Sequence, residues 1–246
     1  MPDASSWVAG VDGCPAGWLV VLREVAGGQA PRFQIVPTFA EVLALPEAPA
    51  IIAVDIPIGL PERSGIGGRQ ADIAARAILG ARQSAVFAVP ARTAVMEADY
   101  RRACDVALLH SEPPRMVSKQ TFNLFPKMRE VDRLLTPELQ RRVIECHPEA
   151  AFVQMNGGVA LDLAKKIKSR PSEPGLALRR DLLERAGFPR ALLDVKPGRV
   201  ADAGPDDLLD ACACAWTAAR VRSGTAMRFP ADPPLDQRGL RQEIWA

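Results

Sequence analysis

The sequence has few of the features that define several large protein classes. Its longest apolar runs fall far short of the ~20 residues that a transmembrane helix needs. No cationic and apolar leader precedes the first apolar run, so we expect no signal peptide and a cytoplasmic protein. The net charge is only +2 at pH 7, which is too weak to indicate nucleic-acid binding by itself.

Cysteine and glycine patterns exclude further classes of site. The five cysteines include no C-x-x-C pair and their number is odd, which argues against a disulfide framework or a zinc site. The glycine-rich stretch Ser64–Gly68 lacks the lysine and the flanking strand of a phosphate-binding loop. We interpret this stretch as a hinge and most of the thiols as buried and free.

What remains is the composition of an ordinary globular protein. Hydrophobic residues make up 48% of the 246 residues and charged residues 24%. This length suits one elaborated domain or two small ones. Most of the cations are arginines, which bind phosphates in a forked geometry, although arginine richness also follows from genome composition.

Apolar runs and turn residues predict an α/β order of elements. Short links predict that the first three strands form antiparallel hairpins, and Thr38 is placed to cap the first helix. The expected strands are Val8–Asp12, Trp18–Leu22, Phe33–Val36, Ile51–Asp55 and Arg142–Cys146, and the expected helices include Phe39–Leu45, Leu176–Ala186 and Asp206–Arg222.

These elements predict one mixed five-stranded sheet of order 3-2-1-4-5, with helices on both faces. A helical, arginine-rich insertion is expected between strands 4 and 5, over residues 62–141. The tail 227–246 is expected to be a surface strap, and the whole chain 1–246 to be a single domain.

Carboxylates recur where apolar runs end. Asp12 and Asp55 each close such a run, and Asp207 and Asp210 lie one turn apart on the last predicted helix. A buried carboxylate is costly unless it is paired or binds a metal. Because strands 1 and 4 would be parallel neighbours, these four aspartates are expected to converge on Mg²⁺ or Mn²⁺, in a two-metal site for phosphoryl chemistry.

Each acidic residue also has a structural interpretation. Asp12-Gly13 is typical of a hairpin turn, Asp55 of a strand-end turn, and Asp207 of a helix N-terminus. Their occurrence together, in this order along the chain, favours the metal site over these structural interpretations. Glu145 and Glu149 flank His147, so either glutamate could add a ligand, or His147 could orient a water, or all three could be a hydrogen-bonded strand end.

The order of motifs resembles the ribonuclease H fold. Asp207 to Ala213 is similar to the D-x-x-D-A-x-A motif of RuvC-type nucleases. The chain more closely resembles an uncharacterised family of predicted RNase H-like nucleases, domain of unknown function 429. The matching segments span residues 7 to 223 and are Gly10–Cys14 with Gly17-Trp18, Asp55–Leu60, Glu145–Glu149 and Asp207–Ala211.

This resemblance implies a metal-dependent nuclease or related phosphodiester hydrolase with Asp12, Asp55, Asp207, Asp210 and Glu145 as catalytic residues. RuvC-like enzymes usually carry Glu on strand 4, where this chain has the shorter Asp55.

Several basic and polar residues of the insertion are candidates for substrate binding. We single out Arg76, Lys119 and Gln120, which could hold a phosphate or a base edge or form a solvated surface.

The expected partner is a nucleic-acid substrate and not a membrane, and a homodimer is one assembly we consider. The competing functions are a noncatalytic interaction scaffold of the same fold and an actin-like ATPase or sugar kinase. Actin-like enzymes need two copies of the fold, and only one Asp-led sheet is predicted here.

Overall fold

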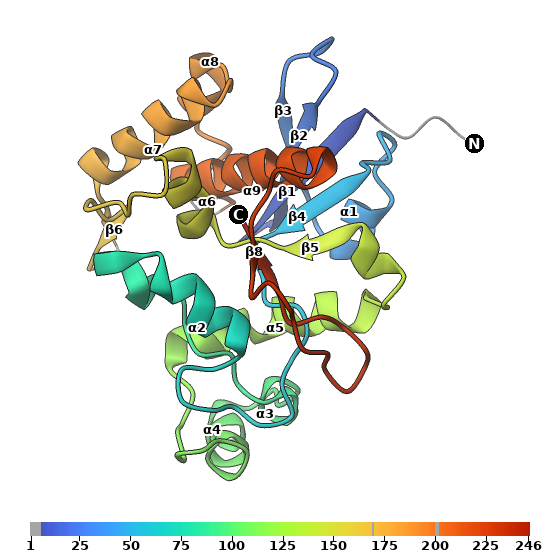
Figure 1. The fold of residues 1–246 in the computed structure, drawn as a ribbon, viewed down its shortest axis with the longest axis vertical. Helices are drawn as coiled ribbons and strands as arrows, with labels where there is room; N and C mark the ends of the chain where they lie inside the picture. The colour runs from blue at the N-terminus through green and yellow to red at the C-terminus, as the bar shows by residue number, and fades with distance from the viewer. Residues whose placement is uncertain (1–5, 169, 200–201) are drawn as a thin grey trace.

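A five-stranded mixed sheet forms the centre of the protein (Figure 1). The computed structural model describes residues 6–168, 170–199 and 202–246. The strands lie in the order β3-β2-β1-β4-β5, which confirms the prediction and is an RNase H-like topology. Their bounds are β1 (Trp7–Cys14), β2 (Gly17–Glu24), β3 (Arg32–Val36), β4 (Ile51–Val54) and β5 (Val143–Glu145).

The first hairpin is tighter than the sequence indicated. The antiparallel ladder continues past Asp12 to the pair Cys14 and Gly17, so the turn consists of Pro15 and Ala16. The turn interpretation of Asp12-Gly13 is therefore wrong. Gly13 pairs with Trp18 in this ladder, and the side chain of Lys127 lies over it, 2.5 Å from where a Cβ would be.

The parallel half of the sheet brings the first two aspartates together. β1 pairs with β4 in parallel, and Val11 lies opposite Val54. The next residue, Asp55, donates its backbone N–H to the Val11 carbonyl over 2.9 Å. Asp12 and Asp55 therefore lie side by side where these strands leave the core.

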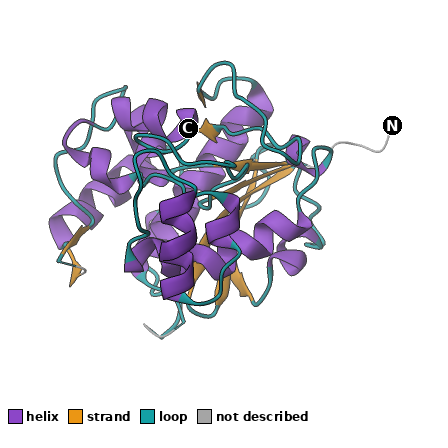
Figure 2. Ribbon diagram, turned by 90° about the horizontal axis from the view of Figure 1, so that it is seen from below, coloured by secondary structure: helices purple, strands orange, loops and turns teal. Residues whose placement is uncertain are grey.

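Helices cover both faces of the sheet, so the strands are buried on two sides (Figure 2). Successive β1 residues alternate between two cores: Val8 belongs to one, Ala9 and Val11 to the other. The Val8 core contains residues of α6 (Pro148–Met155), α7 (Glu173–Arg185) and α9 (Pro205–Ser223). The Val11 core contains residues of α1 (Phe39–Leu43), which Thr38 caps as predicted, and α5 (Lys119–Leu134).

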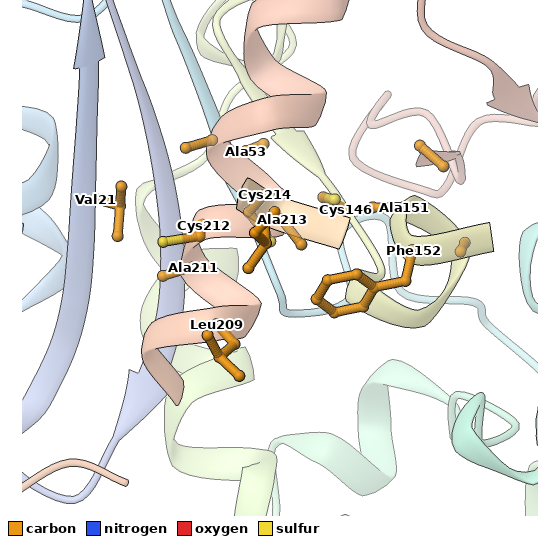
Figure 3. Packing of buried hydrophobic residues seen from close by; sticks show 14 of the residues in the cluster. Val21, Ala53, Cys146, Ala151, Phe152, Leu209, Ala211, Cys212, Ala213 and Cys214 are labelled. Carbon is orange, nitrogen blue, oxygen red and sulfur yellow. The ribbon is translucent and has the colours of Figure 1, made fainter. Parts of the chain in front are cut away.

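The last helix, α9, lies directly on β1. A Cβ on Gly10 would approach the Ala215 nitrogen to 2.0 Å and the Ala211 carbonyl oxygen to 2.1 Å, so only glycine fits here. Small buried side chains on α9, among them Ala211, Cys212 and Ala213, make this close packing possible (Figure 3). Asp12 follows Gly10 by two residues and so points to the same face of the sheet.

A helical insertion separates β4 from β5, as predicted. It lies below the sheet in Figure 1. Its elements are α2 (Gln70–Ala77), the 3₁₀-helix η1 (Gly80–Ala85), α3 (Arg92–Val95), α4 (Tyr100–Leu109), α5 and the 3₁₀-helix η2 (Leu139–Arg141). Between α6 and α9 the chain forms the hairpin β6 (Lys166–Ile167) with β7 (Arg170–Pro171), then α7 and α8 (Arg190–Leu193).

The C-terminal tail is anchored to the domain. It forms the hairpin β8 (Arg228–Phe229) with β9 (Ile244–Trp245), and Leu240 and Ile244 are buried. Arg92 pairs with Asp236, which ties the tail to the insertion. Within the described ranges, no helix combines the length and the apolar character that crossing a bilayer requires.

Candidate metal centre

Three of the predicted aspartates meet at one point. Asp12, Asp55 and Asp210 each offer a carboxylate oxygen, and these oxygens all lie within 4.8 Å of one another. Asp12 and Asp210 are buried and Asp55 is half-buried. We call these three residues the acidic triad. Their oxygens are the hard ligands that Mg²⁺ and Mn²⁺ prefer.

The main elements of the fold fix the positions of the triad. Asp12 lies within β1, Asp55 follows β4, and Asp210 is on the second turn of α9. The contact of Gly10 with Ala211 and Ala215 sets the depth of α9 on the sheet, and Asp210 immediately precedes Ala211. The third carboxylate therefore comes close to the first two through backbone packing.

The triad is electrostatically unbalanced. Burial, followed by the charges of Asp55 and Asp210, raises the pKa of Asp12 well above its usual range. Burial and then Asp210 raise the pKa of Asp55 to about 7. Burial also raises the pKa of Asp210, although Lys165 opposes it. The Oδ1 atom of Asp210 has no hydrogen-bond partner among the described residues. A divalent cation would relieve both the repulsion and the unpartnered oxygen, so the residues fit the predicted metal.

Asp207, the fourth predicted ligand, has a different setting. It lines the same cavity as the triad, but its Oδ2 accepts a hydrogen bond from the Gly204 backbone over 2.7 Å. This contact caps the N-terminus of α9. Burial raises its pKa to about 6, although the Gly204 hydrogen bond lowers it. Its roles as metal ligand and as catalytic residue stay predictions.

Glu145, the fifth predicted catalytic residue, is paired with an arginine. Arg69 donates to both of its carboxylate oxygens, over 2.6 and 2.8 Å, and the Ile58 backbone N–H donates over 2.7 Å. Arg69 also bonds Asp72 over 2.7 Å. Burial still raises the pKa of Glu145 to about 7, against the effect of Arg69. This network joins α2 of the insertion to β5, and a catalytic role of Glu145 stays a prediction.

Glu149 and His147 line the same cavity as Glu145. Arg179 donates to both oxygens of Glu149, over 2.7 and 2.6 Å. Burial lowers the pKa of His147. Its Nε2 lies 3.3 Å from the Ala85 carbonyl oxygen, while its Nδ1 has no partner in the described part of the chain.

A cavity of about 420 Å³ opens over the triad. Of the three predicted substrate-binding residues, Gln120 lines it, whereas Arg76 and Lys119 are not among the described residues of its wall. Arg76 donates to the Val86 carbonyl over 2.9 Å. The Lys119 ammonium lies 4.3 Å from the centre of the Tyr100 ring. Whether any of the three binds substrate stays a prediction.

Other cations do line the cavity, and they are Arg69, Arg82, Lys127, Lys165 and Lys166. Lys165 pairs with Asp210, and Lys166 pairs with Asp206 over 2.5 Å. Burial alone would lower the pKa of Lys165, but Asp210, Glu149 and Asp55 raise it above its usual range. Neither lysine could be singled out from the sequence, because Lys165 lies in a loop and Lys166 in the two-residue strand β6, and no periodic pattern marks either position.

Comparison with known proteins supports the resemblance carried by the motifs. No curated protein and no solved structure matches the chain. A family model described as "Protein of unknown function (DUF429)" matches residues 10–235, a span that holds the whole triad. The chain therefore belongs to the DUF429 family.

Proposed function

We propose that the protein is a Mg²⁺- or Mn²⁺-dependent phosphodiester hydrolase that acts on nucleic acid. The observation that carries the proposal is the acidic triad, whose oxygens lie within 4.8 Å of one another, with Asp12 within β1, Asp55 directly after the parallel strand β4, and Asp210 on α9. A divalent cation held there would neutralise phosphate charge and lower the pKa of an attacking water.

The chain's own residues divide the work around that cation. Asp12, Asp55 and Asp210 would hold it in a site that is largely shielded from water, where electrostatic interactions are strong. Arg82 lines the cavity, and its buried Nε has no hydrogen-bond partner among the described residues. Its guanidinium would contact a substrate phosphate.

Apolar residues on the cavity wall suit the rest of a nucleotide. Phe87 and Leu124 lie on the same wall as Gln120, which can donate and accept hydrogen bonds. A cavity of about 420 Å³ with mixed polar and apolar walls is in the usual size range of small-ligand sites. These features support a substrate that inserts one nucleotide into the site.

The noncatalytic scaffold is the main alternative. A scaffold has no need for three clustered carboxylates that share one lysine, since a buried charge without a partner costs stability. The actin-like ATPase has less support, because the described residues contain one five-stranded sheet and those enzymes need two.

The test is cleavage of a labelled panel: single- and double-stranded DNA, single- and double-stranded RNA, and a small aryl phosphodiester, each with Mg²⁺, Mn²⁺ or EDTA. We expect metal-dependent cleavage of at least one substrate by the wild type and none by Asp210→Asn. Equal rates in the two proteins would exclude catalysis at the triad. Metal binding without cleavage of any substrate would favour the scaffold.

A further inference from the structure

Lys165 brings a positive charge to the acidic triad. It lies in the loop between α6 and β6, and its ammonium pairs with Oδ2 of Asp210. Its side chain is 23% exposed and that of Asp210 only 3%, so the pair is largely shielded from water. Lys165 also lines the same cavity as all three carboxylates.

The loop holds this lysine through contacts on both sides of it. Arg179 donates to the Leu163 carbonyl over 3.0 Å. The Lys165 carbonyl accepts from Ser172 N–H over 2.8 Å. A Cβ on Gly175 would lie 1.9 Å from the Ala164 carbonyl oxygen, so α7 presses against the backbone just before Lys165. These contacts fix the backbone around Lys165, so the fold itself holds the lysine at the site.

The pairing leaves Asp210 with limited capacity for metal. Its Oδ2 contacts Lys165, and only its Oδ1 has no partner among the described residues. An aspartate that binds two cations through separate oxygens offers one oxygen to each. Asp210 has a single oxygen to offer while Lys165 stays in place.

Charge balance also limits the number of divalent cations that the triad can hold. Most of the neighbouring acids have cationic partners: Arg69 pairs with Glu145 and Asp72, Arg179 with Glu149, and Lys166 with Asp206, whereas Asp207 accepts a hydrogen bond from the Gly204 backbone. The triad carries three negative charges when ionised, and Lys165 offsets one. A single divalent cation offsets the remaining two, whereas a second would leave the triad and Lys165 with excess positive charge in a largely buried site, which is costly.

We propose that Lys165 takes the place of a second metal ion, so that the triad holds one divalent cation per chain. This inference rests on the proposed function, and it replaces the two-metal expectation drawn from the sequence. Lys165 acts as a positioning residue: it fixes Oδ2 of Asp210 and leaves Oδ1 to the metal.

Equilibrium dialysis against Mn²⁺, with the bound metal counted per chain, tests the proposal. We expect one equivalent in the wild type and two in Lys165→Met, because the substitution frees Oδ2 of Asp210 and removes one positive charge. Lys165→Arg keeps the charge and should return the count to one. Lys168→Met removes an exposed lysine of the same hairpin and should also bind one equivalent.

Other numbers of bound Mn²⁺ per chain would distinguish a failure of this inference from a failure of the proposed function. Two equivalents in the wild type, or one in a folded Lys165→Met, would overturn the role of Lys165 and leave the hydrolase standing. No Mn²⁺ in any variant would overturn both. Thermal melts of the same samples establish folding, and if Lys165→Met does not fold, Lys165→Gln takes its place under the same criteria.

Discussion

Two groups of buried carboxylates line one cavity, and they differ in their partners. Glu145 and Glu149 each receive two hydrogen bonds from a buried arginine. The triad has one lysine for three carboxylates, and an oxygen of Asp210 has no partner among the described residues. A buried acid with an arginine of its own is suited to holding elements together. A cluster short of positive charge is suited to binding a cation.

The largest expected effect is on catalysis. Asp55→Asn removes an anionic ligand and keeps the shape of the side chain. We expect the cleavage rate to fall by at least about 10³-fold, which corresponds to ~4 kcal/mol of transition-state stabilisation. Stability near neutral pH should hold or rise, since repulsion in the triad decreases. Rates and melting temperatures measured on one preparation decide this, and a variant that melts early yet cleaves normally would assign Asp55 to the structural group.

Removing the arginine partner of a buried acid should lower the stability of the protein, whereas Asp55→Asn should not. Arg69→Met leaves Glu145 and Asp72 buried without their cation. We expect the free energy of unfolding to fall by roughly 3–5 kcal/mol. Urea titration measures it. Arg190→Met, which removes exposed ion pairs, is the matched control and should change the free energy of unfolding little. Equal losses in the two variants would contradict the structural role of Arg69.

Metal should stabilise the native protein through the triad alone. A ligand that binds only the native state, at a hundred times its dissociation constant, adds about 2.7 kcal/mol. We expect Mn²⁺ to raise the melting temperature of the wild type and of Glu145→Gln, but not that of Asp12→Asn. A shift that persists in Asp12→Asn would place the metal elsewhere.

The pH dependence of the metal-free protein should also separate the two groups. The pKa of Asp55 rises on folding from 3.8 to about 7, so the native state keeps a proton that the unfolded chain releases between these values. Its contribution to stability therefore falls as pH rises across that window. We expect a change of up to about 4 kcal/mol across the window, since one pKa unit corresponds to about 1.4 kcal/mol. Urea titrations in EDTA at several pH values should show a flatter profile for Asp55→Asn.

The smallest expected effect concerns substrate phosphates. Arg82 lines the cavity and its Nε has no partner among the described residues, whereas Lys119 lies over the Tyr100 ring outside it. Arg82→Met should reduce the slope of log affinity against log salt by about one, and Lys119→Met should leave it unchanged. Filter-binding titrations with Asp55→Asn as background prevent cleavage during the measurement. The reverse result would restore Lys119 as the phosphate contact.

The sheet could be predicted because its information is local. Apolar runs, turn residues and short links fix strands and hairpins, and parallel pairing then places Asp12 beside Asp55. Asp210 could be predicted as a site residue because it lies one helical turn after Asp207 on the last predicted helix. The observed strand order agrees with the predicted sheet, and the family model agrees with the resemblance carried by the motifs.

The partners of the acids could not be predicted in the same way. Arg69 meets Glu145, and Lys165 meets Asp210, only through the tertiary fold. A glutamate after an apolar run has the same pattern whether an arginine or a metal neutralises it. The cap formed by Asp207 has a similar ambiguity, since an acidic residue in the first turn suits both a cap and a ligand.

The contact between Gly10 and α9 also sets the order in which the protein can mature. On the ribosome, β1 and β4 emerge early, and they bring only Asp12 and Asp55. Asp210 reaches them after almost every other element has been synthesised, when α9 docks on Gly10. Contacts between distant parts of a chain form late, because a long loop must close first. A growing chain therefore carries an incomplete acidic cluster, and the proposed metal site is completed only in the finished fold.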